Sequence, residues 1–489
     1  MIQMPRYPSD GDIGAQLVRA LADEVANFMR PVSGPTHSAL GEEAIRDLLV
    51  AEIPRRSLGP NSIESFVTEI FSKHIRSYRH PLHFGHQRPA PNAASLIADM
   101  LNGATNTTVS VFEAGPISVA LEKHVQSWLL GLFNMPVHSC VTFTNGGSES
   151  VLTALLSARI RFERDNPDLD IRTTRIFVGS DAHYSAERAI RILGLSPTNV
   201  IRVPVMPDGQ TSASALRKLV SAVKAEGVPI LAIVATSGST ACGAFDDLTA
   251  FRQIADTCGA WLHVDACHGG ACRLVPELAR YIRGLEHADS FSWDPHKMMW
   301  VSPPCACLFM RRRRDLNLAL ADDLERASYI LDGITDRPSE TASESLEWTL
   351  SCTRSFSALK VYLTLILYGL DGIAERIRSM HDLACKLAAA VAADHRFKLF
   401  ANPAFNIVCF QHRNVGSDVS AGHRQLRLNL AVADKCYLTG AEIHGEYWLR
   451  AQFTSEATRE SDISKLLDIV DAEASHIRAS DTPLKISGV

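Results

Sequence analysis

The chain has 489 residues, of which 46% are hydrophobic and 21% are charged, as in soluble globular proteins. Its 49 basic and 54 acidic residues give a net charge of −5, so no positive excess points to nucleic acid or to an anionic membrane as a partner. The longest apolar runs, such as residues 228–235, are far shorter than the ~18 residues of a membrane span. The N-terminus has no apolar stretch of the signal-peptide kind, and none of the eleven cysteines forms a C-x-x-C pair. We therefore expect a protein of the reducing cytoplasm.

The expected elements change character along the chain. Residues 1–75 are predicted to form a helical segment, because apolar residues recur at helical spacing within it. From residue 141 onwards, short β-branched runs alternate with amphipathic stretches such as 212–225 and 248–258, which is typical of an α/β domain with a mostly parallel sheet. The predicted strands are residues 141–144, 175–178, 200–203, 230–235, 261–265, 289–292 and 306–310.

The last part of the chain is predicted to form a separate unit. It contains an alternating run at 405–410, a second run at 446–453 and a final helix at 462–477. We therefore predict three parts: an N-terminal helical segment that makes dimer contacts, a large domain and a small C-terminal α/β domain. Their predicted bounds are 1–75, 76–370 and 371–489.

Lys297 is the first candidate for a catalytic residue. It ends the sequence Trp-Asp-Pro-His-Lys, just after a predicted strand, so the turn is expected to direct it from the sheet edge into a cleft. Desolvation there lowers the pKa of a lysine, and its amine then forms a Schiff base. Taken alone, a lysine in a loop is most often exposed, so this motif needs support from other residues.

Asp265 provides that support, because it ends an apolar strand at the edge where α/β sheets bind ligands. A carboxylate at this point can hold the protonated ring nitrogen of pyridoxal 5'-phosphate (PLP). Strand alternation puts His263, Asp265 and Cys267 on one face. The alternative is a metal site formed by these three residues and His268. We consider it weaker, because His268 is expected to point to the opposite face.

The turn Gly146-Gly147-Ser148 follows another predicted strand and opens a helix that covers residues 151–161. Its glycines let the backbone approach an anion, and the helix N-terminus offers free N–H groups. Ser148 is expected to cap the helix and to bind phosphate. No Gly-Lys-Ser/Thr follows, so this is not a Walker loop.

His183 also follows a strand, and its ring is predicted to stack on a flat aromatic ring. Each of these features fits an ordinary turn, cap or loop when it is taken alone. Together they place an anion cradle, a stacking imidazole, a carboxylate and a lysine at successive strand ends. This combination predicts a PLP site.

With these residues the chain resembles the group II PLP-dependent amino acid decarboxylases, which have the aspartate-aminotransferase-like fold type I. The resemblance extends from about His80 to Thr454 and includes the motifs Asn-Gly-Gly-Ser-Glu-Ser, Ala-His-Tyr-Ser, His-Val-Asp-Ala and Pro-His-Lys. It implies a homodimer that acts on a small amino acid without a metal. In the implied site Lys297 carries PLP, Asp265 meets the ring nitrogen and His183 stacks on the ring. Further implied contacts to the cofactor come from Gly147, Ser148, Thr236 and His296, and Arg450 is implied to grip the substrate α-carboxylate.

Several segments, among them Pro-His-Lys-Met-Met and Ser-Cys-x-Arg, are more similar to the glutamate and cysteine-sulfinate decarboxylase branch than to the aromatic branch. This resemblance implies an acidic substrate such as glutamate, aspartate or cysteine sulfinate. Arg88 and Gln87 are candidates to bind its side chain, although a surface salt bridge explains Arg88 equally well. His86 occupies the position where the glutamate branch has glutamine and the 2,4-diaminobutyrate branch has histidine.

One departure from the family leaves the reaction outcome open. Members of the family often carry a proton-donating tyrosine on a mobile loop before the Cys-x-Arg segment. Here residues 331–350 contain no tyrosine, and Tyr329 lies just before them. The alternatives are therefore a 2,4-diaminobutyrate or aromatic substrate, oxidative decarboxylation to an aldehyde, or a non-catalytic binding protein on the same fold.

Overall fold

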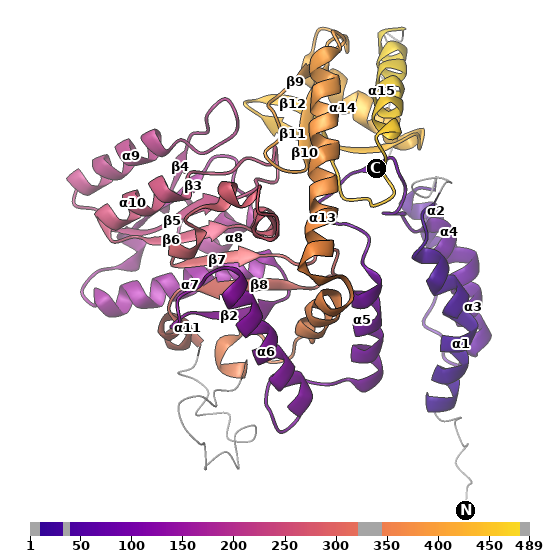
Figure 1. Cartoon of the computed structure of the whole chain (residues 1–489), viewed down its shortest axis with the longest axis horizontal. Helices are drawn as coiled ribbons and strands as arrows, with labels where there is room; N and C mark the ends of the chain where they lie inside the picture. Colours follow the sequence, from indigo (N-terminus) through magenta and orange to yellow (C-terminus); the bar gives the residue numbers. More distant parts are fainter. Residues whose placement is uncertain (1–9, 33–39, 321–344, 480–489) are drawn as a thin grey trace, which may run out of the picture.

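The computed structural model describes residues 10–32, 40–320 and 345–479 (Figure 1). Its strands form a seven-stranded sheet in the order β2-β8-β7-β6-β5-β3-β4 and a five-stranded sheet in the order β1-β11-β12-β10-β9. The strands of the large sheet are β2 (Cys140–Thr144), β3 (Arg175–Gly179), β4 (Val200–Val203), β5 (Ile230–Thr236), β6 (Trp261–Asp265), β7 (Ser290–Trp293) and β8 (Ala306–Met310). Those of the small sheet are β1 (His83–Phe84), β9 (Phe397–Leu399), β10 (Ile407–His412), β11 (Tyr437–Ile443) and β12 (Glu446–Gln452).

The large sheet confirms the predicted α/β class. All of its strands run parallel except β8, which is antiparallel to both of its neighbours, β2 and β7. Each predicted strand is present, and its bounds differ from the prediction by at most one residue. The helices that connect or cover these strands are α5 (Ala93–Thr105), α6 (Pro116–Leu132), α7 (Gly147–Asp165), α8 (Ser185–Ile192), α9 (Ala213–Ala225), α10 (Leu248–Cys258) and α11 (Arg313–Leu320).

Both faces of the large sheet are buried, which explains why its strands are almost continuously apolar. Alternate residues of one strand belong to two different cores. Leu262 and Val264 of β6 join the core that includes α10, whereas Trp261 joins the core beneath α7 and α8. The sheet is therefore the middle layer of the domain (Figure 1).

Local sequence signals set the helix ends. Ser212 accepts a hydrogen bond from the Ala215 N–H at the start of α9, and Asp247 does the same for Ala250 at the start of α10. Gly259 ends α10 at a φ of 65°, a left-handed conformation that glycine adopts without steric cost. Caps of this kind made both helices predictable to within a residue.

The small sheet begins far from the rest of its chain segment. β1 pairs in parallel with β11, so His83 and Phe84 lie beside Tyr437 and Leu438. The predicted boundary at residue 76 assigned this short strand to the large domain, and the structure places it in the small sheet instead. Helices α14 (Val419–Val432) and α15 (Ser461–Ala479) accompany the small sheet.

Helix α13 (Ser357–Ala393) connects the two sheets and crosses the predicted boundary at residue 370. Gly369 interrupts it with a φ of 63° and ψ of 172°, so it consists of two helical pieces. Among the described helices α13 is the one that has the length and apolar character to cross a membrane. Its residues Val361, Ile377 and Leu387 are nevertheless buried in the protein core, as expected of a core helix.

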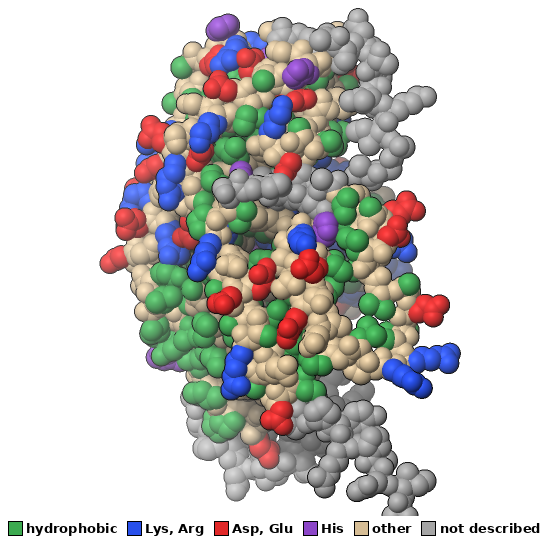
Figure 2. Space-filling model, turned by 90° about the vertical axis from the view of Figure 1, so that its right-hand side faces the viewer, with side chains coloured by type: hydrophobic (Ala, Val, Ile, Leu, Met, Phe, Trp, Pro, Cys, Tyr) green, Lys and Arg blue, Asp and Glu red, His purple; other side chains and the backbone are tan. Residues whose placement is uncertain are grey.

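The N-terminal helices stand apart from the rest of the molecule in Figure 1. They are α1 (Asp10–Phe28), α2 (Glu42–Arg46), α3 (Pro60–Ser65) and α4 (Ser72–His74), and α3 and α4 are joined by a π-helical turn. Arg79 ties the end of α1 to the body by donating from Nε to the Phe28 carbonyl at 2.9 Å. Large hydrophobic side chains are exposed along this segment, including Val18, Val50 and Ile53. Figure 2 looks onto this side and shows hydrophobic side chains in several surface groups.

Candidate active site

A cavity of about 560 Å³ opens at the carboxyl edge of the large sheet. Residues that follow five parallel strands, β2, β3, β5, β6 and β7, meet there because the carboxyl ends of parallel strands share one edge. Nine of the predicted site residues line this cavity: Gln87, Arg88, Gly147, Ser148, His183, Thr236, Asp265, His296 and Lys297.

Lys297 lies three residues after Asp294 in the turn that follows β7. Its Nζ is 3.2 Å from Asp294 Oδ2. Burial alone lowers the pKa of this amine, but the nearby negative groups, with Asp294 foremost, raise it above the ordinary lysine value. The predicted lowering of its pKa by desolvation is therefore wrong for the unloaded chain, because the carboxylates outweigh burial.

Asp265 ends β6 at the floor of the cavity. Its Oδ1 accepts a hydrogen bond from the Cys267 backbone N–H at 3.2 Å. Burial raises the pKa of this carboxyl, but the Lys297 charge and the Cys267 hydrogen bonds together hold it below its usual value. Asp265 therefore carries a negative charge at neutral pH.

The predicted anion cradle is the N-terminus of α7. The helix begins at Gly147, four residues earlier than expected, so Gly146 is the N-cap. The prediction that Ser148 caps the helix is wrong, since Ser148 is already inside the first turn. No side chain caps α7 among the described residues, which leaves its first backbone N–H groups facing the cavity. A Cβ on Gly147 would lie 2.3 Å from Cys267 Sγ, so this close approach requires glycine.

Two histidines of the cavity are held by hydrogen bonds. His183 Nδ1 lies 2.8 Å from Ser185 Oγ, and His296 Nδ1 lies 2.6 Å from the Cys305 carbonyl oxygen. Burial lowers the pKa of both rings, so both are neutral at pH 7. Since a carbonyl oxygen only accepts, Nδ1 of His296 carries the proton and its Nε2 does not.

The predicted substrate residues fall into two groups. Arg88 and Gln87 follow β1 directly and line the cavity. His86 and Arg450 do not line it: His86 Nε2 lies 3.0 Å from Tyr437 Oη, and Arg450 donates to Thr439 Oγ1 and Gln452 Oε1. Their roles, and those of the cofactor residues, remain predictions. Tyr329 lies outside the described residues.

The alternative metal site is not supported. His263 Nδ1 bonds Ser290 Oγ at 2.9 Å and His268 Nε2 bonds Asn406 Oδ1 at 2.7 Å, so their rings serve other partners. Within residues 10–32, 40–320 and 345–479, no three histidine, cysteine or acidic side chains are grouped as metal ligands would be. The expectation that His268 points away was wrong, because the chain leaves the strand at Asp265 and His268 also lines the cavity.

Sequence reasoning gave no role to Asp294, Asn145 or Thr240, all of which line the cavity. Asp294 had a detectable signal, since it lies in the same motif as Lys297. Its side chain is 3% exposed as a residue average, and its Oδ1 has no hydrogen-bond partner among the described residues.

The cavity fits PLP on several independent points. Lys297 supplies an amine, Asp265 a charged carboxylate for the ring nitrogen, and α7 an uncapped N-terminus for the phosphate. Two buried oxygens at the rim, Ser237 Oγ and Asp294 Oδ1, lack partners within the described structure, as expected of a site that is completed by a polar ligand.

Comparison with known proteins agrees with this geometry. Residues 43–413 match the pyridoxal-dependent decarboxylase conserved domain. Tryptophan decarboxylase TDC1 of Camptotheca acuminata is 28% identical over 97% of this chain and 96% of its own length. A glutamate decarboxylase-like protein of Gibberella zeae is 30% identical over 78% of this chain and 79% of its own.

Solved structures support the same fold. The structure of Oryza sativa TDC with PLP and tryptamine superposes with a TM-score of 0.89 and 22% identity, and it covers 96% of this chain and 99% of that one. The fold is thus that of the fold-type-I PLP decarboxylases. The cavity at the sheet edge is the cofactor site of this fold, and the chain belongs to the pyridoxal-dependent decarboxylase family.

Proposed function

We propose that this PLP-dependent amino acid decarboxylase removes the α-carboxyl group of an acidic amino acid such as glutamate, aspartate or cysteine sulfinate. The observation that carries the proposal is the chemistry of the cavity wall. Arg88 lines the cavity and makes no ion pair with any described residue, so its charge is available to a carboxylate or sulfinate. The described lining has two prolines as its larger apolar side chains and contains no Phe, Tyr, Trp, Leu, Ile, Val or Met.

The proposed roles of the protein follow from the positions of its side chains. PLP, when it is bound, supplies the electron sink for the carbanion that is left when CO2 departs. Lys297 holds the cofactor aldehyde through its amine, and Asp265 keeps the ring nitrogen protonated. The N–H groups at the start of α7 bind the phosphate. Arg88 and Gln87 orient the substrate, which fixes the bond to be broken and restricts water.

The decisive experiment offers a panel of acidic, basic and aromatic amino acids to the purified, PLP-loaded enzyme and measures both CO2 and the nitrogen-containing product. We expect the highest kcat/KM for an acidic amino acid, with amine as the product and no CO2 from a Lys297→Ala variant. A preference for an uncharged amino acid would contradict the proposed substrate. Full CO2 release by Lys297→Ala would contradict the mechanism.

A second candidate is an aromatic substrate, which the similarity to a tryptophan decarboxylase over nearly the whole chain favours. The same panel separates the two candidates. The product assay also separates amine formation from oxidative decarboxylation, which would give an aldehyde with ammonia and peroxide.

We also propose that the enzyme is a homodimer. An apolar hollow of about 420 Å³ is lined by Trp128, Leu365, Ile366, Leu370 and their neighbours on α6 and α13, and Ile366 is 63% exposed. Hydrophobic surface of this kind is usually covered by a partner. Sedimentation should give a dimer for the native chain and for Val137→Asp, a control at an isolated exposed site, and a monomer for Ile366→Asp. A native monomer would contradict the proposal.

A cytoplasmic location remains a further proposal. All eleven cysteines lie in the described residues and all are free thiols, which supports a reducing compartment. Fractionation of the source cells, with detection of the native chain, would test it, and recovery from the secreted fraction would contradict it.

A further inference from the structure

Asp294 is a buried carboxylate at the junction of three functional elements. Its Oδ2 lies 3.2 Å from Lys297 Nζ and 3.5 Å from His296 Nε2. Both of its oxygens would lie within 3.4 Å of a Cβ built on Gly147, so the carboxylate also adjoins the start of α7. The Asp294 backbone N–H donates to the Cys267 carbonyl at 3.1 Å, which fixes the turn after β7 against the turn after β6.

The charges around Lys297 can be listed from the elements that face it. From the turn after β6 come Asp265, Cys267 and His268, from the turn after β3 comes His183, and from its own turn come Asp294 and His296. Arg88 acts on His296 from the opposite wall. Burial raises the pKa of the Cys267 thiol well above its usual value, so this thiol is uncharged at neutral pH.

Burial also keeps the three histidines neutral, because it lowers the pKa of His183 and His296 and brings that of His268 to about 3. Two negative groups therefore remain beside the amine, Asp265 and Asp294. In the loaded enzyme Asp265 is assigned to the ring nitrogen of PLP. Asp294, at ion-pair distance from Nζ, is then the carboxylate left for the lysine nitrogen.

We propose that Asp294 is the counter-ion that keeps the Lys297 nitrogen protonated and so sets the pH range in which this nitrogen reacts. The site thereby divides two carboxylates between two cationic nitrogens, with Asp265 for the cofactor ring and Asp294 for the lysine. His296 supports this arrangement, because its proton is held on Nδ1 by the Cys305 carbonyl and its Nε2 cannot donate to Asp294 in the neutral ring. The inference rests on the PLP site and does not depend on the proposed substrate.

The test measures the reactivity of Lys297 in the PLP-free enzyme by trace acetylation between about pH 7 and pH 11, with peptide mapping at position 297. The variant is Asp294→Asn, which keeps the size of the side chain and removes its charge. The matched control is Asp99→Asn. Asp99 is paired with a different buried lysine, Lys360, at 2.8 Å, and it does not line the cavity.

In the native enzyme we expect the midpoint of Lys297 acetylation to lie above that of an ordinary lysine, about 10.4. Asp294→Asn should lower the midpoint by at least about one pH unit, which raises acetylation at about pH 9 roughly tenfold. Asp99→Asn should leave Lys297 unchanged. In the loaded enzyme the pH midpoint of the visible cofactor band should move in the same direction in Asp294→Asn alone.

An unchanged Lys297 midpoint in Asp294→Asn would overturn the inference, and so would equal shifts in the two variants. If Asp294→Asn does not fold, Asp294→Ser serves in its place. A native midpoint at or below the ordinary lysine value would refute the inference without any variant. Because acetylation needs no amino acid substrate, an error in the proposed substrate would leave this result standing.

Discussion

Thr236 and Asp265 are register partners at the carboxyl ends of the neighbouring parallel strands β5 and β6. The next residue after Thr236, Ser237, donates its backbone N–H to the Asp265 carbonyl at 2.8 Å. Both Thr236 and Asp265 line the cavity. The carboxylate that is predicted to meet the cofactor ring is thus held by the sheet itself, and not by a loop.

This position makes Asp265 a sharp test of the cofactor site. Asp265→Ala removes the negative charge that balances the ring nitrogen, so we expect weak PLP binding and a fall in kcat of at least about 100-fold. Absorbance titration with PLP and turnover of the best substrate measure the two effects. Asp265→Asn, which preserves the shape, should lose kcat as well. Near-normal turnover in either variant would argue against the pairing.

Arg88 tests the recognition of the substrate side chain. Arg88→Ala should raise KM for acidic amino acids by about tenfold or more, the worth of a charge-assisted hydrogen bond, with little change in KM for uncharged ones. Arg88→Lys should recover part of the loss because it retains the charge. Steady-state kinetics on one acidic and one uncharged amino acid provide the measurement. An equal effect on both would remove Arg88 from side-chain recognition.

Gly147 tests the close packing at the start of α7. A Cβ at this position would lie 2.3 Å from Cys267 Sγ and 3.3 Å from Asp294 Oδ2. Gly147→Ala should therefore displace the turn and raise the Kd for PLP by about tenfold, within the usual cost of overpacking. Adding Cys267→Ala should restore affinity by making room. Gly103→Ala, in α5 with nothing within 4 Å, is the matched control and should bind PLP normally.

His263 predicts a pH dependence of stability. Its ring is fully buried, and burial lowers its pKa to about 4 from an ordinary value of 6.5. Between these values the unfolded chain binds a proton that the native chain does not, so the free energy of unfolding falls as the pH falls. From pH 6.5 to about pH 5 this residue alone should cost up to about 2 kcal/mol.

Urea unfolding at the two pH values measures this contribution. His263→Asn should lose less stability on acidification than the native chain. His395→Asn, at a side chain that is 97% exposed, is the control and should behave like the native chain. Identical pH dependence in the native chain and His263→Asn would contradict the assignment.

The ion pair between Arg354 and Glu122 predicts a large structural effect. Arg354 precedes α13 and donates to Glu122 of α6 through both terminal nitrogens, and the Glu122 side chain is fully buried. Arg354→Met leaves an unpaired buried charge, so we expect a loss of about 3–5 kcal/mol in urea unfolding. Changing Glu122 to Gln in the same chain should recover part of it.

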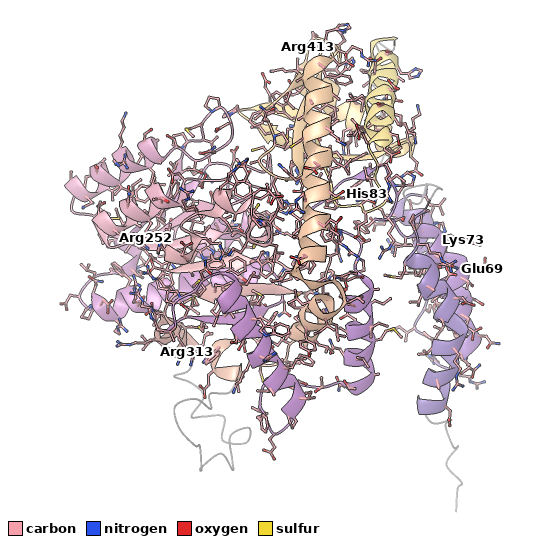
Figure 3. The ribbon with its side chains drawn as sticks, viewed as in Figure 1. Glu69, Lys73, His83, Arg252, Arg313 and Arg413 are labelled. Carbon is pink, nitrogen blue, oxygen red and sulfur yellow. The ribbon has the colours of Figure 1, made fainter. Side chains whose placement is uncertain are left out.

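The control for this prediction lies on the N-terminal helices, where Figure 3 shows Lys73 and Glu69. Both of their side chains are more than half exposed. Lys73→Met should cost at most about 0.5 kcal/mol, because water already screens an exposed pair. A comparable loss in the two variants would show that burial does not set the strength of the Arg354 pair.

The sequence predicts the large sheet well because each of its strands is recognisable by itself. Residues 261–265 and 306–310 are apolar runs whose faces are both buried, and caps such as Asp247 define the helices between strands. Most candidate site residues could be found for the same reason, since Lys297, Asp265 and His183 each follow such a strand.

What the sequence did not predict depends on contacts between distant segments. β1 has two residues and no periodicity, so its pairing with β11 has no local signal. His268 turned into the cavity because the strand ends at Asp265, and strand alternation no longer applies beyond that residue. The ion pair between Asp294 and Lys297, and the resulting rise in the pKa of the lysine, follow from the geometry of one turn.

The pairing of β1 with β11 also bears on how the enzyme is made. His86, at the start of the cavity wall, is bonded to Tyr437, which lies 351 residues later in the sequence. During translation Arg88 leaves the ribosome early, but the strand beside which it is anchored is synthesised near the end. A nascent chain that has completed the large sheet therefore still lacks a fixed substrate wall. The specificity of the enzyme should mature only after the chain is released, even if the vitamin has been captured before.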